Sequence, residues 1–375
     1  LYFIESQTKS QEMATRVNPD LVDGGAALEV IDYVVDLDRA VQSKDISLAQ
    51  LCDKRFNEVG REAGLGFDKK TKQYHAWPAA DSKAITELQL DHKTLVIYKI
   101  LTTKFLFQDR SVTFQSAGRA WAAFQDALRL IASDDVVFDL PNSFLWDIFD
   151  EMVYQITVVY KKRMTRRKEI RVDWSVQNVI ETLEKFVEKI GIDDELQQVQ
   201  SGSLQPEALL APSKHHMQVA AGLFAIIALM RIDVLLGDFE GALRRLERLG
   251  IPLLGRRYFT GENIEGGAAA HISLYFHVGF CYLMLRRYVD AASFFRTCIM
   301  AKSYRRYSER TQTDAAYLYN VASILGGFGA EDVSNTVDER QRATFEDDVR
   351  ELAAGQHDRF REVFSRSAPR FLSIP

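Results

Sequence analysis

Long stretches without proline constrain the fold of this chain more than its other sequence features do. The 375 residues include eight prolines, and the stretches 142–205 and 253–368 contain none. Proline breaks a helix interior because it lacks an amide hydrogen and clashes with the preceding turn. The pattern therefore predicts helices joined by short connectors, and it argues against collagen, proline-rich disorder and a β sandwich with many turns.

The net charge, the cysteine content and the hydropathy exclude several further classes of protein. The net charge is −5, so a polyanion would have to meet a local basic patch rather than a basic protein. Cys52, Cys281 and Cys298 are too few for a disulfide scaffold and are typical of buried thiols in a reducing compartment. The longest run of apolar or small residues, 219–230, has twelve residues. That is shorter than a membrane span, so we expect no membrane contact.

Apolar residues recur at three- and four-residue spacing from about Ala27 onward, which is the period of amphipathic helices. The clearest linker is the segment that holds Ser201-Gly202-Ser203 and the prolines at 206 and 212. Along the chain we expect a poorly ordered segment 1–28, an N-terminal helical region 29–200, a linker 201–213 and helical repeats over 214–375.

Two helix pairs after the linker resemble each other at an offset of 49 residues. The aligned positions are Phe239 with Tyr288, Ala242 with Ala291, and Leu246 with Phe295. In a tetratricopeptide hairpin, an aromatic side chain at the turn fills the wedge between two helices, and a small residue three positions later permits close contact. The match is degenerate. The second pair has Gly279, whose small size lets the partner helix approach closely, whereas the first pair has Met230 at the same position.

This repeat predicts an all-α fold, a right-handed tetratricopeptide-like solenoid of antiparallel helix hairpins. Unrelated amphipathic helices are the alternative. We expect Tyr288 and Ala291 to be buried between neighbouring helices. The complete set of predicted packing residues is Gly237, Phe239, Ala242, Gly279, Tyr282, Tyr288, Ala291 and Phe295.

Sequence motifs for catalysis or cofactor binding are missing. The chain has no P-loop, nucleophile elbow, HExxH helix or CxxC pair, and Gly64-Leu65-Gly66 lacks the third glycine of a dinucleotide fingerprint. His215 and His216 would point about 100° apart on a helix, so we expect a polar helix start rather than a metal site. We expect His271 and His277 to be partly buried or at the surface. The sequence thus predicts no catalytic residue, cofactor, metal or small-molecule substrate.

Two charged clusters have both a structural and a functional interpretation. Asp147, Asp150 and Glu151 share one helical face, where neighbouring carboxylates can split their pKa values and act as acid and base. We favour a solvated face near a helix start, because no nucleophile or cofactor loop accompanies them. The basic run consists of Lys161, Lys162, Arg163, Arg166, Arg167, Lys168 and Arg171. It is either a solvated helix end or a contact for RNA phosphate or an acidic protein, and it lacks the interleaved aromatics of base recognition.

The segment 140–151 resembles the l subunit family of eukaryotic translation initiation factor three. The residues that carry this signature are Leu140, Pro141, Asn142, Leu145, Trp146, Asp147, Asp150 and Glu151. Further matches follow in the family's order at 235–239, 275–288 and 368–373, and Trp77-Pro78 and Tyr98-Lys99 also look like family positions. The resemblance covers roughly residues 77–375 and is faint before them.

This resemblance implies a non-catalytic, cytoplasmic scaffold whose helical repeats lead into a PCI module, a repeat array closed by a winged helix. It implies packing against sister subunits, especially k and e, and contact with the small ribosomal subunit mainly through the complex. The family continues beyond the 368–373 match, so we expect this chain to lack the winged helix. Two alternatives remain open: a PCI-type subunit of the proteasome lid or signalosome, and a free peptide-binding repeat module of the co-chaperone kind.

Overall fold

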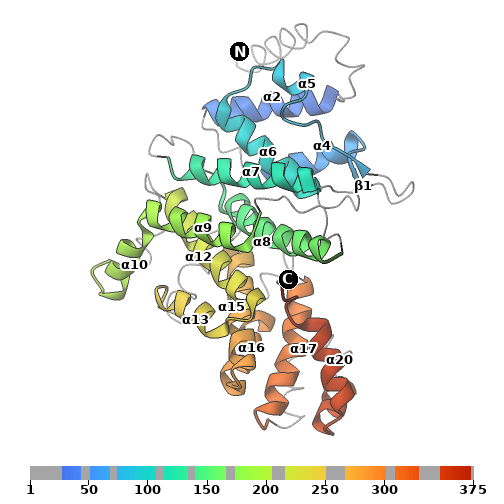
Figure 1. Cartoon of the computed structure of the whole chain (residues 1–375), viewed down its shortest axis with the longest axis vertical. Coiled ribbons are helices and arrows are strands. Elements are labelled where there is room, and N and C mark those ends of the chain that lie inside the picture. Colours follow the sequence, from blue (N-terminus) through green and yellow to red (C-terminus); the bar gives the residue numbers. More distant parts are fainter. Residues whose placement is uncertain are drawn as a thin grey trace. The chain divides into compact units, whose positions relative to one another are not determined.

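The computed structural model describes residues 28–43, 51–67, 74–106, 114–133, 140–165, 174–204, 216–250, 267–300, 309–328 and 347–372. These residues form an all-α fold of helix hairpins, as predicted, and the strands among them are two two-residue strands (Figure 1). The chain divides into two compact units, 1–178 and 179–375.

The first unit contains short and long helices and one minimal strand pair. Its elements are α2 (Leu28–Ser43), the π-helix η2 (Leu51–Arg55), α4 (Phe56–Glu62), β1 (Gly66–Phe67), β2 (Tyr74–His75), α5 (Lys83–Thr86), α6 (His92–Leu106), α7 (Phe114–Ile131) and α8 (Asn142–Thr165). The strands β1 and β2 are antiparallel, with Gly66 opposite His75.

An aromatic cluster forms the core around α2, α4 and α6. The rings of Phe56 and Trp77 stack with centroids 4.1 Å apart, and Tyr33 and Tyr98 approach the Trp77 ring at 6.1 and 6.5 Å. The Tyr98 hydroxyl donates a hydrogen bond of 2.8 Å to the Pro78 carbonyl. The two short family matches, Trp77-Pro78 and Tyr98-Lys99, therefore meet in one core.

A second aromatic contact closes the first unit beyond α8. Trp174 is fully buried, and its ring stacks on Trp121 of α7 with centroids 5.7 Å apart. The amide of Val176 donates to the Tyr160 hydroxyl at 3.0 Å, which ties the chain after residue 174 to the last part of α8.

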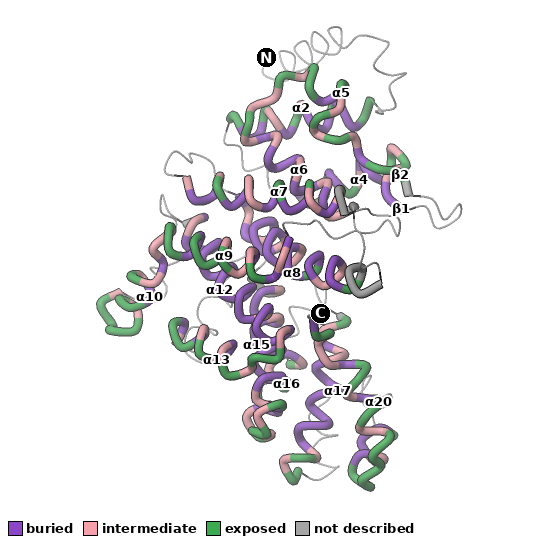
Figure 2. Tube along the Cα trace, viewed as in Figure 1, coloured by how far each residue is buried: buried purple, intermediate pink, exposed green. Residues whose placement is uncertain are grey.

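The second unit is a series of helix pairs. Its elements are α9 (Val176–Ile190), most of which lies in this unit, α10 (Ile192–Gln200), α12 (His216–Leu236), α13 (Phe239–Glu247), α15 (Gly267–Met284), α16 (Tyr288–Met300), α17 (Glu309–Leu325) and α20 (His357–Ser367). Residues 347–353 are also helical. Figure 2 shows the buried residues concentrated in α12 and α15.

Helix α12 shows why hydropathy alone is a poor guide to location. The stretch Met217–Leu236 is long and apolar enough to cross a membrane, but 89% of its 18-residue apolar window is buried inside the protein. The twelve-residue run 219–230 underestimates the length of the apolar helix, because apolar residues continue past Arg231 and Asp233. Burial among neighbouring helices accounts for its composition.

One turn geometry recurs at four helix ends of the second unit's described part. Gly237, Arg286, Gly327 and Gly355 all have positive φ, between 62° and 84°. The next amide in each case bonds back five residues, to the carbonyls of Asp233, Tyr282, Ser323 and Glu351, over 2.8–3.2 Å. This bonding closes a helix and reverses the chain in a short distance, which is the geometry of an αα-hairpin.

The helix α10 and most of α9 lie in the same compact unit as α12 to α16. Ile192 of α10 is fully buried, and a Cβ added at Gly222 of α12 would lie 2.9 Å from the Ile192 side chain. The compact units thus divide between Asn178 and Val179. Residues 205–213 of the expected linker lie outside the described residues, and the predicted domain scheme stays a prediction.

Candidate interaction surface

The predicted packing residues of the second hairpin lie where α15 and α16 meet. Ala291 and Phe295 are fully buried. A Cβ added at Gly279 would lie 3.0 Å from the Phe295 ring and 3.2 Å from Phe294. Glycine at position 279 therefore permits the close approach of α16. Tyr288, expected to be buried, is only half-buried, because it begins α16 directly after the turn.

The aromatic side chains of both hairpins also contact each other. Phe239, at the start of α13, is half-buried and packs edge-on against Phe280 of α15 with centroids 6.0 Å apart. Tyr282 faces Phe294 at 5.4 Å and carries the Arg287 guanidinium over its ring at 4.6 Å. Ala242 is fully buried and Gly237 is exposed at the turn. The first hairpin thus packs on the second through Phe239.

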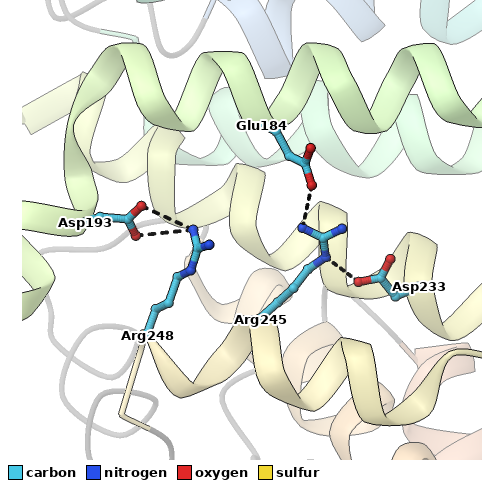
Figure 3. A network of polar contacts seen from close by, with 5 residues as sticks. All are labelled: Glu184, Asp193, Asp233, Arg245 and Arg248. Atoms are coloured by element: carbon cyan, nitrogen blue, oxygen red, sulfur yellow. Dashed lines mark hydrogen bonds and ion pairs between the residues drawn. The ribbon is translucent and has the colours of Figure 1, made fainter.

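A polar network joins α9 and α10 to the first hairpin (Figure 3). Arg245 of α13 extends between Glu184 of α9, at 2.9 Å, and Asp233 of α12, with which it forms an ion pair. Arg248 forms a second pair with Asp193 of α10 at 3.2 Å. Burial raises the pKa of the Asp233 carboxyl, and the hydrogen bond from Arg245 opposes that rise.

Sequence reasoning did not find this network. Its residues come from four helices, and no local spacing marks them as neighbours. The only signal is that Asp233 and Arg231 interrupt an otherwise apolar helix, since a charge at such a position needs a partner. The network is structural in kind, because each carboxylate faces a guanidinium from another helix.

The family signature lies across the start of α8. Leu140, Leu145 and Trp146 are buried, while Asp147, Asp150 and Glu151 are half-buried. Asp147 forms an ion pair with Lys104 of α6. The signature therefore combines core residues with polar residues that connect α8 to α6.

Asn142 is of a residue type favoured at helix N-caps, but its side chain does not cap α8. The helix begins at Asn142 itself, and the Leu145 amide bonds to the carbonyl of Pro141 at 3.0 Å. Pro141 therefore takes the N-cap position, whose carbonyl accepts the first bond of the helix. The Asn142 side-chain oxygen is buried without a hydrogen-bond partner in the described part of the chain.

The Glu151 carboxyl of the signature has a raised pKa. Burial raises its pKa to about 7, with a further rise from Asp150 and opposing effects of the Gln155 hydrogen bond and the Lys104 charge. The Gln155 amide donates to Glu151 at 2.8 Å and to the Thr103 carbonyl at 3.2 Å. A carboxyl that titrates near neutral pH can hold or release a proton, but its contacts here connect α8 to α6.

The basic run lies mostly outside the described residues. Lys161 is exposed on α8, and the side chains of Lys162 and Arg163 are not described although their backbone is helical. Arg166, Arg167, Lys168 and Arg171 lie outside the described residues. The described residues on either side are fixed, because Val176 bonds to Tyr160 and Trp174 is fully buried.

Two histidines and the three cysteines are buried in the helical core. His271 and His277 are both buried, more deeply than expected, and burial lowers their pKa values to about 4 and about 3. Burial also raises the pKa of the Cys281 thiol to about 12. His215 and the side chain of His216 lie outside the described residues. Among the described residues, no three His, Cys, Asp or Glu side chains gather to hold a metal ion.

Comparison with known proteins places these features in a family. The family model described as RNA polymerase I-associated factor PAF67 matches residues 117–375. The chain belongs to this family. The match includes the α8 signature, both hairpins and the segment 368–372, so the PAF67 family description covers the whole second unit.

Curated relatives of this PAF67-family chain are named eukaryotic translation initiation factor 3 subunit L. The relative from Nematostella vectensis is 27% identical over 82% of the chain, and the human relative is 25% identical over 79%. The chain spans 62% and 55% of these two proteins' lengths. The relative from Yarrowia lipolytica is 24% identical over 99% of the chain. The resemblance to the l subunit family is therefore confirmed, and it extends before Trp77.

Proposed function

We propose that this chain is a non-catalytic scaffold subunit of a cytoplasmic translation initiation factor three complex. The observation that carries the proposal is the shared name of its curated relatives, eukaryotic translation initiation factor 3 subunit L, over 79–99% of the chain. Helical hairpins suit this role, because stacked hairpins offer extended surfaces to other proteins.

The polar chemistry of the described residues supports a structural role. The candidate acid–base residue Asp147 pairs with Lys104, and Glu151 takes its raised pKa mainly from burial. Cys281 and Cys298 are buried, and burial raises the pKa of both thiols, which disfavours the nucleophilic thiolate. An enzyme would be favoured only if Asp147→Ala abolished an activity while the fold was retained.

The partners proposed for the chain are the sister subunits k and e, and the small ribosomal subunit reached mainly through the complex. The basic run 161–171 is proposed to contact RNA phosphate or an acidic partner, because it nets +6 in a chain whose total charge is −5. Such contacts weaken as salt concentration rises.

Affinity purification of the tagged full chain from cells tests the scaffold proposal. Recovery of initiation factor three subunits with the small ribosomal subunit is the expected result. Recovery of proteasome lid or signalosome subunits instead would overturn it. Recovery of RNA polymerase I subunits would favour a second candidate, a role in RNA polymerase I transcription, which the description of the PAF67 family suggests.

Charge reversal tests the basic run separately. Arg166→Glu with Arg167→Glu should weaken salt-sensitive association with the ribosome or partner while leaving thermal unfolding unchanged. The matched control is Lys185→Glu with Lys189→Glu, which makes the same charge change at two exposed positions of α9. Equal co-sedimentation of both double variants and the unmodified chain would remove the basic run from the proposal. Binding of acidic C-terminal peptides would instead favour the co-chaperone-like alternative.

A further inference from the structure

The segment 368–372 leaves α20 and returns to the first hairpin of the second unit. The Leu372 amide donates a hydrogen bond of 2.8 Å to the carbonyl of Leu235, near the end of α12. The Phe371 ring contacts Phe239 of α13 at 6.2 Å and Phe280 of α15 at 6.0 Å between centroids. Residues far apart in sequence are therefore joined by one backbone bond and two ring contacts.

The bond to Leu235 completes the end of α12. The last carbonyls of a helix have no partner within it and need one from elsewhere. The turn supplies amides to two of these carbonyls, those of Asp233 and Val234. The Leu372 amide supplies the partner for the carbonyl of Leu235. The corner formed by Leu235, Phe239 and Phe280 thus offers an acceptor beside two aromatic rings.

The two side chains of the segment are held differently. Leu372 is 8% exposed and Phe371 is 44% exposed, although its ring touches two others. Phe364 of α20 stacks on the same Phe280 ring at 5.9 Å, so α20 has its own contact to α15. The helix can therefore stay packed when the segment beyond it is released, because a segment with few buried contacts opens locally at low cost.

We propose that the Leu235–Phe239–Phe280 corner is a binding site for an extended segment with adjacent aromatic and aliphatic side chains. Residues 368–372 of this chain occupy the site as an intramolecular strap. The strap ties α20 to the first hairpin, and a partner that used the same corner would have to displace it. The proposal does not depend on the identity of the complex in which the chain acts.

Hydrogen exchange of the full chain tests the strap. Phe371→Ala should accelerate exchange of the Leu372 amide about tenfold, because two aromatic contacts are lost, and should accelerate tryptic cleavage after Arg370 in parallel. Exchange of the α20 amides should stay unchanged. The matched control is Phe328→Ala, which removes a phenylalanine that is 41% exposed at the end of α17. The control should leave the Leu372 amide unaffected.

A double-mutant cycle separates a specific contact from general weakening. Phe239→Ala should release the Leu372 amide as Phe371→Ala does, and the double variant should add little to either change. Additive effects of the two substitutions would overturn the proposal, as would an unchanged Leu372 amide in Phe371→Ala. The proposal would also be overturned if the α20 amides lost their exchange protection together with residues 368–372. These residues would then be part of the packing of α20 rather than a strap.

Discussion

The two hairpins of the second unit reach the same backbone geometry with different residues. Gly237 ends α12 with φ of 84°, and Arg286 ends α15 with φ of 62°, 49 residues later. In both, the following amide bonds back five residues, at 2.9 and 2.8 Å. An arginine in this conformation is less favourable than glycine by roughly 1 kcal/mol. The turn is therefore specified by its hydrogen bonds and helix packing rather than by glycine.

The interactions around the turns differ. Asp238 caps α13, since its carboxylate accepts a hydrogen bond of 2.8 Å from the Gly241 amide. The equivalent Arg287 instead pairs with Asp290 at 2.8 Å and lies over the Tyr282 ring. The second hairpin also buries His271 and His277. Two hairpins of one shape should therefore fail under different conditions.

The largest expected effect is shared by both hairpins. Ala291→Arg and Ala242→Arg should each lower the free energy of unfolding by about 4 kcal/mol, because both alanines are fully buried and an arginine would overpack the contact and bury a charge. Chemical denaturation measures the loss. The matched control is Ser293→Arg, an exposed position on α16, which should change stability by less than about 0.5 kcal/mol. Equal stability of Ala291→Arg and the control would show that the helices do not meet at Ala291.

Residue spacing predicted most of the fold but few of its polar contacts. The 49-residue offset located α12, α13, α15 and α16, because burial of an apolar stripe imposes a local period. The half-exposure of Tyr288 and the N-cap at Pro141 could not be predicted. Both depend on the first residue of a helix, which a sequence pattern does not locate to within one position. The Arg245 network and the strap at Leu372 join residues from separate helices. Their geometry depends on tertiary packing, which one sequence does not reveal.

The second effect distinguishes the hairpins by acid sensitivity. Burial, together with the nearby charge of Arg231, lowers the pKa of His277 to about 3. An unfolded histidine has a pKa of about 6.5, so below that pH the unfolded state binds more protons than the folded state. Stability that is present above pH 6.5 is therefore lost as the pH falls, by about 2 kcal/mol at pH 5 from His277 alone. The measurement is unfolding free energy against pH.

Substitution of the histidine itself sharpens this test. His277→Ala copies Ala228, the residue 49 positions earlier in α12. Its pH slope between 7 and 5 should be shallower than that of the unmodified chain, whatever the cost of the substitution at pH 7. His357→Ala removes an exposed histidine of α20 and should leave the slope unchanged. A slope that is the same in all three proteins would rule out burial of His277.

A smaller effect probes the close approach of α16 to α15. Gly279→Ala should destabilise the chain by about 1 kcal/mol, because the new Cβ would lie 3.0 Å from the Phe295 ring. The better helix propensity of alanine offsets part of this cost. Gly118→Ala in α7 is the control, since a Cβ there meets nothing within 4 Å and the propensity gain should raise stability. Opposite signs in thermal unfolding support the close contact, and equal gains would contradict it.

A last effect, of similar size, concerns the one cap that the hairpins do not share. Asp238→Ala should cost about 1 kcal/mol, because the Gly241 amide at the start of α13 loses its acceptor. Glu240→Ala, in the same first turn and exposed, should cost less. Arg287→Asp places the capping residue in the second hairpin but removes both the contact with the Tyr282 ring and the ion pair with Asp290. If its stability stays within about 0.5 kcal/mol of the unmodified chain, the cap and the cation–π contact are equivalent solutions for one turn. A loss larger than that of Asp238→Ala would instead show that the second hairpin depends on Arg287.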